Sequence, residues 1–226
     1  LLTELEHHAN YVPWHFLREK KGAIIKFAKC NDKGEVEIDE IKKLITSKTK
    51  IIAVTHLSNV TGAILPIKKI VDLAKSKKIP VVVDGCQGAP HLPLDVQELG
   101  CDFYAISCHK MYGPTGVGIL YAKKKWTDIL PPYQGGGGMI EEVKKESITF
   151  PKSPTKFEAG TLQTAEVVGF SESIKFIENI GIKNIMVTTV KMTLGDSQMI
   201  ELLDFSSHKK EILQRSINDI GPTHLA

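Results

Sequence analysis

The chain has 226 residues, of which 42% are hydrophobic and 24% are charged, and its formal net charge is +3. This length suits one large domain, or one domain with part of another. The small net charge and dispersed basic residues exclude the concentrated basic surface of a nucleic-acid-binding protein, and no apolar run approaches the ~18 residues of a membrane span.

The first half of the chain alternates between strand and helix patterns. Residues 23–28 predict a strand, residues 31–34 a turn, and residues 38–45 a helix with its apolar residues on one face. Residues 51–55 predict the next strand, and a helix opens at Pro66, because proline is tolerated in a first helical turn. This order is typical of β-α-β units.

Three more strands are predicted at residues 79–83, 102–107 and 117–121, the last after a glycine-rich turn. Strands that alternate with helices favour an α/β fold, in which helices flank a mainly parallel sheet. In such sheets ligands bind beyond the carboxyl ends of the strands.

Polar residues follow three of these predicted strands. They are Asn59 after residues 51–55, Asp84 and Gln87 after residues 79–83, and Ser107, His109 and Lys110 after residues 102–107. Because the carboxyl ends of parallel strands meet at one edge, we expect these side chains to share a site.

Lys110 is the most informative of these residues. It follows an apolar run at 103–106 and precedes the glycine-rich turn, and Ser107 and His109 beside it can donate hydrogen bonds. A lysine in this setting favours a Schiff base with pyridoxal 5'-phosphate (PLP), whose phosphate would be held by the neighbouring donors.

Asp84 and Gln87 each allow two interpretations. A carboxylate at the pyridine nitrogen of PLP keeps that nitrogen protonated, which lets the ring accept electrons. Alone, however, Asp84 would be a turn or capping residue. Gln87 could reach the phenolic oxygen of the ring, or it could be a surface amide.

His7 and the Gly135 to Gly138 run also have two interpretations each. The His7 imidazole could stack on a flat cofactor or move a proton, or it could be a structural histidine. The glycine run could cradle a phosphate, but no Lys-Ser/Thr signature follows it, so it is not a P-loop. A flexible loop is the simpler interpretation.

Four cysteines, Cys30, Cys86, Cys101 and Cys108, show neither CxxC pairing nor zinc-ligand spacing, and the first residues do not resemble a signal peptide. We therefore expect a reducing, cytoplasmic location and no structural metal. Adjacent His7 and His8 would point to opposite faces of a strand and rarely chelate one ion.

Five separated motifs resemble the class V aminotransferase family in order and spacing, and most closely its SufS-type cysteine desulfurase/selenocysteine lyase branch. They are EHHANYVPW at 6–14, SNVTG at 58–62, VDGCQ at 83–87, SCHKMYGPTG at 107–116 and FEAGT at 157–161. The likeness covers residues 1–185, and it implies the large domain of a fold-type I PLP-dependent transferase.

The resemblance also implies a role for each matching residue. Lys110 would form the Schiff base and shuttle protons, Asp84 would contact the pyridine nitrogen, Gln87 would bind the ring oxygen and His7 would stack on the ring. These four positions would control the chemistry of the cofactor.

The remaining matches concern the phosphate and the substrate. Ser107 and His109 would bind the phosphate, and Asn59 would lie close to the ring oxygen and the substrate carboxylate. Thr161 would reach the phosphate of a neighbouring subunit, so the resemblance implies a homodimer.

The implied activity is that of a PLP-dependent cysteine desulfurase, which converts L-cysteine to L-alanine and passes persulfide sulfur to an acceptor protein for iron–sulfur cluster assembly. L-Selenocysteine is the alternative substrate. The alternatives are a non-catalytic PLP-binding fragment, a selenocysteine lyase, or another class V member such as an epimerase or kynureninase.

The chain departs from the family pattern at both ends. It begins inside the motif region, and residues 186–226 are interpreted as a divergent tail with helices at 199–203 and 209–217 and one arginine, Arg215. The family's sulfur-accepting cysteine has no match after Cys108, so we expect impaired activity. Cys86 and Cys108 adjoin predicted cofactor residues, but we interpret both as structural and predict no persulfide on either.

Overall fold

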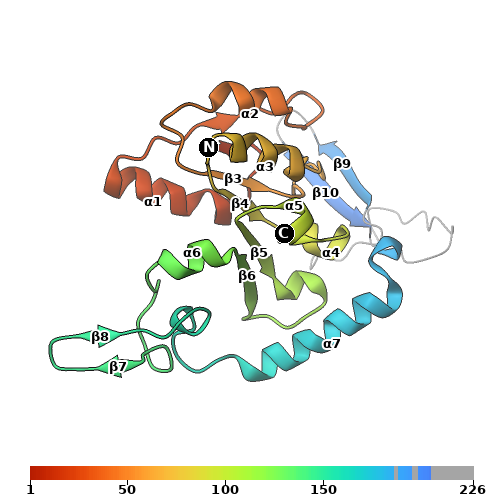
Figure 1. Cartoon of the computed structure of the whole chain (residues 1–226). Helices are drawn as coiled ribbons and strands as arrows, with labels where there is room; N and C mark the ends of the chain where they lie inside the picture. Colours follow the sequence, from red (N-terminus) through yellow and green to blue (C-terminus); the bar gives the residue numbers. More distant parts are fainter. Residues whose placement is uncertain (186–187, 195–197, 205–226) are drawn as a thin grey trace.

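A four-stranded sheet forms the centre of the computed structural model, which describes residues 1–185, 188–194 and 198–204 (Figure 1). Its strands are β3 (Ile52–Thr55), β4 (Val81–Asp84), β5 (Phe103–Ser107) and β6 (Gly118–Ala122), hydrogen-bonded in that order. The first three are parallel and β6 is antiparallel. The predicted α/β class with a mainly parallel sheet is therefore confirmed.

Two helices in the first half of the chain contribute buried side chains to the core. α2 (Ile38–Leu44) lies close to its predicted range, and α3 (Ile67–Ser76) follows Pro66 directly, where a helix was predicted to open. The apolar residues Ile67, Ile70, Val71 and Ala74 of α3 are buried, and β3 is buried along its whole length. This burial on both faces is typical of a parallel strand and explains its unbroken apolar sequence.

β6 runs antiparallel to β5 because the connection between them is short. Residues 108–117 contain the 3₁₀ helix η2 (Cys108–Met111) and the glycine-rich turn, and they leave too little chain for a crossover. Parallel neighbours need a connection of a dozen or more residues. The short connection brings η2 directly to the carboxyl end of β5.

The predicted strand at 23–28 is shorter in the structure. Only β2 (Phe27–Ala28) is a strand, and it pairs in parallel with β1 (Leu2–Thr3). Ile24 is 82% exposed and does not contribute to the core. The Leu1 ammonium donates to the Ile51 carbonyl at 2.9 Å, and the Ala53 N–H donates to the Leu1 carbonyl at 2.9 Å, which attaches β1 to the edge of β3.

Several further elements surround this sheet. They are η1 (His8–Asn10), α1 (Val12–Lys21), α4 (Gly88–His91), α5 (Val96–Leu99), α6 (Lys124–Ile129), β7 (Glu142–Val143), β8 (Ile148–Thr149), η3 (Thr155–Phe157), α7 (Thr164–Ile180) and η4 (Ile182–Asn184). In Figure 1 the β7–β8 hairpin projects away from the sheet at the lower left, and α7 extends along the lower right. Among the described residues, no helix is both long enough and apolar enough to cross a membrane.

The tail differs from its prediction. β9 (Thr188–Leu194) and β10 (Gln198–Asp204) form an antiparallel pair, so the predicted helix at 199–203 is wrong. Residues 199–203 contain apolar residues at spacings that fit a strand as well as a helix, and β9, rich in β-branched residues, supplies a pairing partner. The predicted helix at 209–217 and Arg215 lie outside the described residues.

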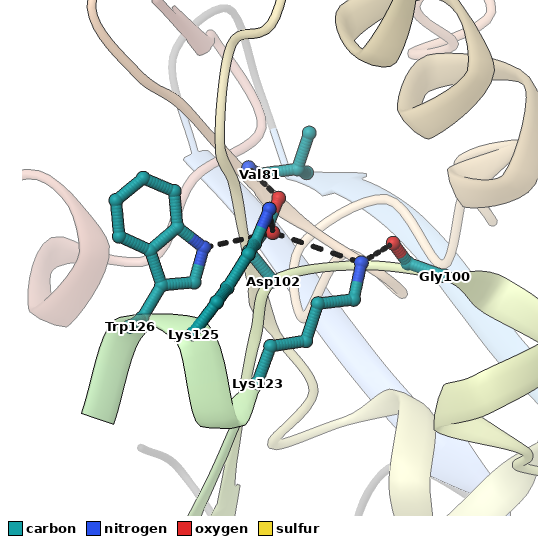
Figure 2. Close-up of polar contacts among 6 residues, drawn as sticks. All are labelled: Val81, Gly100, Asp102, Lys123, Lys125 and Trp126. Atoms are coloured by element: carbon teal, nitrogen blue, oxygen red, sulfur yellow. Dashed lines mark hydrogen bonds and ion pairs between the residues drawn. The ribbon is translucent and has the colours of Figure 1, made fainter. Parts of the chain in front are cut away.

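A polar cluster joins the amino ends of β4 and β5, and we call it the amino-edge cluster: Val81, Asp102, Lys123, Lys125 and Trp126 (Figure 2). The buried Asp102 carboxylate accepts hydrogen bonds from the Val81 N–H at 3.1 Å and from Trp126 Nε1 at 2.8 Å. It also pairs with the Nζ atoms of Lys125 at 2.9 Å and Lys123 at 3.6 Å. This carboxylate therefore ties β4, β5 and α6 together.

The surroundings of Asp102 favour the charged form of its carboxyl group. Burial by itself raises the pKa of this carboxyl, but hydrogen bonds from Trp126, Lys125 and the Val81 backbone and the charge of Lys123 outweigh it, so the pKa is lowered. Lys123 Nζ also donates to the Gly100 carbonyl at 2.5 Å. The amino-edge cluster is thus an internally bonded structural unit.

Candidate functional site

Asp84 is the last residue of β4 and lies at the carboxyl edge of the sheet. Its Oδ1 accepts the Cys86 N–H at 3.0 Å, which closes a tight turn after the strand. Asp84 therefore acts as a turn residue, which is one of its two predicted interpretations. It also fixes the direction of a half-buried carboxylate beside the end of β5.

Three of the predicted site residues lie close to the thiol of Cys86. Its Sγ is 3.3 Å from Ser107 Oγ on the neighbouring strand. Burial raises the pKa of the Cys86 thiol; Ser107, Asp84 and Lys110 are all close enough to influence it as well. The structure thus brings Asp84, Ser107 and Lys110 around one thiol, although they are up to 26 positions apart in the sequence.

Lys110 lies on η2, immediately beyond β5. The Cys108 N–H donates to the Val117 carbonyl and the Gly113 N–H donates to the Cys108 carbonyl, which folds η2 back over the strand end. A residue larger than glycine does not fit at position 113, because a Cβ there would lie 2.8 Å from both the Cys108 oxygen and the Phe170 ring. The half-buried Lys110 amine has no hydrogen bond or ion pair within the described part of the chain.

The two residues that precede Lys110 differ in exposure. Cys108 is fully buried, and burial raises the pKa of its thiol. His109 is exposed. Both Cys86 and Cys108 are free thiols, and raised pKa values leave them mostly protonated at neutral pH, as the structural interpretation requires.

Gln87 and Asn59 lie on the two turns next to this group. Gln87 is the residue before α4, and α4 contacts η2. Asn59 lies in the loop after β3, where Ser58 Oγ accepts the Val60 and Thr61 N–H groups, each at 3.2 Å. Both amides are half-buried, and neither side chain has a hydrogen-bond partner among the residues that the structure describes.

His7 stands before η1, which packs against β3. Its Nδ1 accepts the Ala9 N–H at 3.1 Å, and the ring is exposed. The preceding residue, Glu6, turns inward: its two carboxylate oxygens accept from Thr3 Oγ1 at 2.5 Å and from Asn10 Nδ2 at 2.7 Å. Burial raises the pKa of Glu6 to about 7.

Thr161 lies in a different place from the Lys110 group. The Gly160 N–H donates to the Gly137 carbonyl at 2.8 Å, so this segment rests on the glycine run at 135–138. Thr161 is exposed, and no hydrogen bond in the described ranges joins it to Lys110, Asp84 or Ser107. Gly138 has a φ of +76°, which only glycine adopts readily.

The grouped side chains fit a phosphorylated pyridine cofactor by their chemistry. Asp84, Ser107 and Lys110 supply a carboxylate, a hydroxyl and an amine that has no partner among the described residues, and Gln87 and Asn59 supply two amides in the adjoining turns. These groups match a protonated ring nitrogen, a phosphate, an aldehyde and a ring oxygen. Within residues 1–185, 188–194 and 198–204, no cluster of three or more histidine, cysteine or acidic residues could hold a metal ion.

Sequence reasoning missed one feature beneath this edge. His56 Nδ1 and Tyr104 Oη lie 2.8 Å apart, and both residues are buried. Tyr104 belongs to the apolar run that precedes Lys110, and its position suggested only core packing. Gly85 and Gly88 were the available signal, because glycines flanking Cys86 and Gln87 indicate a close approach of another group.

Comparison with known proteins identifies relatives over most of the chain. The family model for class V aminotransferases matches residues 1–214. A probable cysteine desulfurase of Mycolicibacterium paratuberculosis is 39% identical over 219 residues, covering 94% of this chain and 32% of the relative. A cysteine desulfurase of Yersinia pseudotuberculosis is 45% identical over 186 residues, covering 82% of this chain and 46% of the relative.

Solved structures agree with these matches. The cysteine desulfurase CsdA of Escherichia coli superposes with a TM-score of 0.78 at 40% identity, over 80% of this chain and 46% of the solved chain. The chain therefore spans about a third to a half of the length of these relatives.

Proposed function

The chain belongs to the class V aminotransferase family, and on this premise we propose that it carries the PLP-binding region of a cysteine desulfurase. The reaction would convert L-cysteine to L-alanine and transfer its sulfur atom to an acceptor thiol, which would be neither that of Cys86 nor that of Cys108 and would become a persulfide. One observation supports the proposal above the others: Asp84, Ser107 and Lys110 gather around Cys86 at the carboxyl edge of the sheet.

PLP, when bound, supplies an electron sink for the bond that breaks in the substrate. Lys110 would hold the cofactor covalently and move the proton at its Nζ, which no other described group engages. Asp84 would keep the ring nitrogen protonated, and its turn bond to Cys86 already directs the carboxylate.

The remaining predicted residues would orient the cofactor and the substrate. Ser107 and His109 would bind the phosphate, Gln87 would bind the ring oxygen and His7 would cover the ring face. Asn59 would lie close to the ring oxygen and the substrate carboxylate. Holding the cofactor and the substrate in the reactive orientation supplies a large part of an enzyme's rate enhancement. Residues that backbone turns hold in place suit this orienting role.

Titration with PLP tests the cofactor part of the proposal. The chain should develop an absorbance band near the visible edge, and Lys110→Ala should abolish it. Lys110→Arg is the charge-matched variant: it keeps a cation but forms no Schiff base, so it should also lack the band. Lys69→Ala, which alters an exposed lysine on α3, should leave the band unchanged.

Alanine release from L-cysteine separates the proposal from its main alternative. A chain that shows the band and releases alanine is a desulfurase, whereas the band without alanine supports a non-catalytic PLP-binding fragment. Absence of the band in the unaltered chain would contradict both. L-Selenocysteine in the same assay tests the selenocysteine lyase alternative.

We also propose that the protein acts as a homodimer, with Thr161 directed toward a second subunit. Exposed apolar side chains next to Thr161 support this, namely Leu162, Val167 and Val168 at 55%, 51% and 66% exposure. Exposed apolar patches commonly mark interaction surfaces. A monomeric mass by sedimentation equilibrium at micromolar concentration would contradict the proposal.

The biological setting follows from the SufS-type resemblance and is likewise a proposal. The sulfur would pass to an acceptor protein for iron–sulfur cluster assembly in the cytoplasm. We retain the prediction that neither Cys86 nor Cys108 carries the persulfide, since burial raises the pKa of both thiols. Mass spectrometry after incubation with PLP and cysteine tests this directly.

The boundary between residues 1–185 and the tail at 186–226 remains a prediction. It rests on the sequence motifs, which end before residue 186. Limited proteolysis would test it, because a domain boundary should be cut before the interior of either part.

A further inference from the structure

A buried polar pair lies directly below the turn that carries Asp84, Cys86 and Gln87. His56, the residue after β3, has its Nδ1 2.8 Å from the hydroxyl oxygen of Tyr104 on β5, and the two rings meet edge to face at 89°. His56 is 6% exposed and Tyr104 is fully buried. The pair therefore bridges β3 and β5 across the intervening strand β4.

The turn above rests against both rings. A Cβ at Gly85 would lie 1.8 Å from a Tyr104 ring atom, and a Cβ at Gly88 would lie 2.8 Å from the His56 ring. Both positions thus need glycine because the rings occupy the space. The distance between the turn and the sheet is set by these two side chains.

The His56 backbone strengthens this link. Its N–H donates to the Asp84 carbonyl, and its carbonyl accepts the Leu65 N–H, both at 2.9 Å. One residue therefore connects the end of β4 to the loop that contains Asn59. A displacement of His56 would move both turns of the site.

The pair keeps one protonation state over a wide pH range. Burial lowers the pKa of His56 to about 4 and raises the pKa of Tyr104 far above its usual value. Among the described neighbours, the groups that influence Tyr104 are Cys101, Asp84 and Cys86, and burial alone accounts for His56. Between these limits the hydrogen bond joins two neutral groups.

We propose that His56 and Tyr104 are positioning residues, whose hydrogen bond sets the height of the Asp84–Gln87 turn relative to Lys110. Neither residue would touch the cofactor. Their effect on it rests on the proposed function, because it acts through the contacts of Asp84 and Gln87 with the ring. The effect on the turn itself is independent of any cofactor.

Tyr104→Phe tests the hydrogen bond with the least change in shape. It removes one oxygen and leaves His56 Nδ1 buried without its partner, which favours movement of the His56 ring and of the turn on it. Tyr121→Phe is the matched control, since Tyr121 faces Tyr104 across the β5–β6 ladder and its hydroxyl has no hydrogen bond among the described residues.

His56→Asn and His56→Leu form the second pair of variants. An asparagine amide can occupy nearly the position of Nδ1 and restore a bond to Tyr104, whereas leucine fills space without a polar atom. If the hydrogen bond positions the turn, His56→Asn should recover most of the effect that His56→Leu shows. Equal behaviour of the two variants would contradict the proposal.

The first measurement follows the turn itself without any cofactor. Amide exchange at Cys86 and Ala89, whose N–H groups bond within this turn, should accelerate about tenfold or more in Tyr104→Phe, while the Ile70 amide in α3 should change little. An equal acceleration at all three amides would mean a general loss of stability and would overturn the proposal, whether or not the chain binds PLP.

The second measurement uses PLP. The dissociation constant should rise about tenfold in Tyr104→Phe, and the pH midpoint of the absorbance band should move, because the ring contacts of Asp84 and Gln87 shift. Merely structural residues would lower the melting temperature and leave this midpoint in place. A midpoint and affinity equal to those of Tyr121→Phe would overturn the effect on the cofactor, and absence of any band in the unaltered chain would instead contradict the proposed function.

Discussion

The two ends of β4 and β5 carry polar clusters of opposite character. At the amino ends, the Asp102 carboxylate is bonded to Val81, Trp126 and two lysines. At the carboxyl ends, Asp84 makes one turn bond, and the side chains of Lys110 and Gln87 have no hydrogen-bond partners among the described residues. The same two strands thus end in a saturated structural cluster and in a cluster with free bonding capacity.

This difference separates stability from function. A polar group that is buried without a partner costs about 1–3 kcal/mol, whereas a half-buried group can still bond water. Half-buried polar groups that have no protein partner at one edge of a sheet are therefore free to bind a ligand, unlike the groups of a dense network. The amino-edge cluster shows that this fold can surround a buried carboxylate with hydrogen-bond donors and cations.

The largest expected effect comes from removing the charge at the carboxyl edge. Asp84→Asn keeps an oxygen for the Cys86 N–H, so the turn should persist and the free energy of unfolding should change by less than about 1 kcal/mol. Alanine release should fall about 10³-fold, since the ring nitrogen loses its charged partner. Steady-state kinetics and urea denaturation measure the two quantities, and a large loss of stability with normal turnover would reverse our assignment.

Asp102→Ala should have the opposite profile. It leaves the Val81 N–H, the Trp126 N–H and two lysines without their shared acceptor, so the free energy of unfolding should fall by about 3 kcal/mol. PLP affinity should hardly change at temperatures where the chain stays folded. Urea denaturation followed by PLP titration checks both, and a chain of normal stability would show that this cluster contributes little.

Glu6→Gln tests a third carboxyl group, that of the residue before His7. The pKa of Glu6 rises from 4.5 to about 7 in the folded chain, so the native state binds the proton more tightly than the unfolded state. The resulting stability is complete below pH 4.5 and is lost as the pH rises through about 7. Between pH 5 and pH 8 the unaltered chain should lose about 2 kcal/mol relative to Glu6→Gln.

Urea denaturation at several pH values measures this difference. Glutamine can accept from Asn10 and donate to Thr3, so the variant should fold with the same contacts. His15→Gln serves as a control, because it alters a histidine of the neighbouring helix α1 and should not remove the pH dependence assigned to Glu6. Parallel pH curves for Glu6→Gln and the unaltered chain would refute the assignment.

The smallest effects distinguish two adjacent lysines. Lys125 Nζ lies 2.9 Å from Asp102, whereas Lys124 forms an exposed i,i+4 pair with Asp128 at 2.7 Å. Lys125→Ala should cost about 1 kcal/mol of stability and Lys124→Ala less than about 0.5 kcal/mol. Thermal denaturation of both variants resolves the order, and an equal cost would mean that the buried carboxylate gains nothing from its nearer cation.

Sequence periodicity predicted the central elements well because burial fixes their pattern. β3, β4, β5 and α3 all lie near their predicted positions. α7 was not predicted, and its apolar residues are spread over exposed positions such as Val167, Val168 and Phe176. A helix whose apolar residues occupy exposed as well as buried positions does not show the one-sided pattern that signals a helix.

The order of strands predicted which side chains meet at the carboxyl edge of the sheet, but it did not predict the contacts beneath that edge. The sequence grouped Asp84 with Ser107 and Lys110, and the structure places all three close to Cys86. The bond between His56 and Tyr104 spans 48 positions, and no local pattern records it. The predicted helix at 199–203 failed for the same reason, because its pairing with β9 decides its structure.

The hydrogen bond from the Ala9 N–H to His7 Nδ1 determines the tautomer of that imidazole. An acceptor nitrogen carries no proton, so the neutral ring must hold its proton on Nε2. The exposed edge of the ring can therefore donate a hydrogen bond but cannot accept one. A group approaching His7 from solvent would meet a hydrogen-bond donor and an aromatic face.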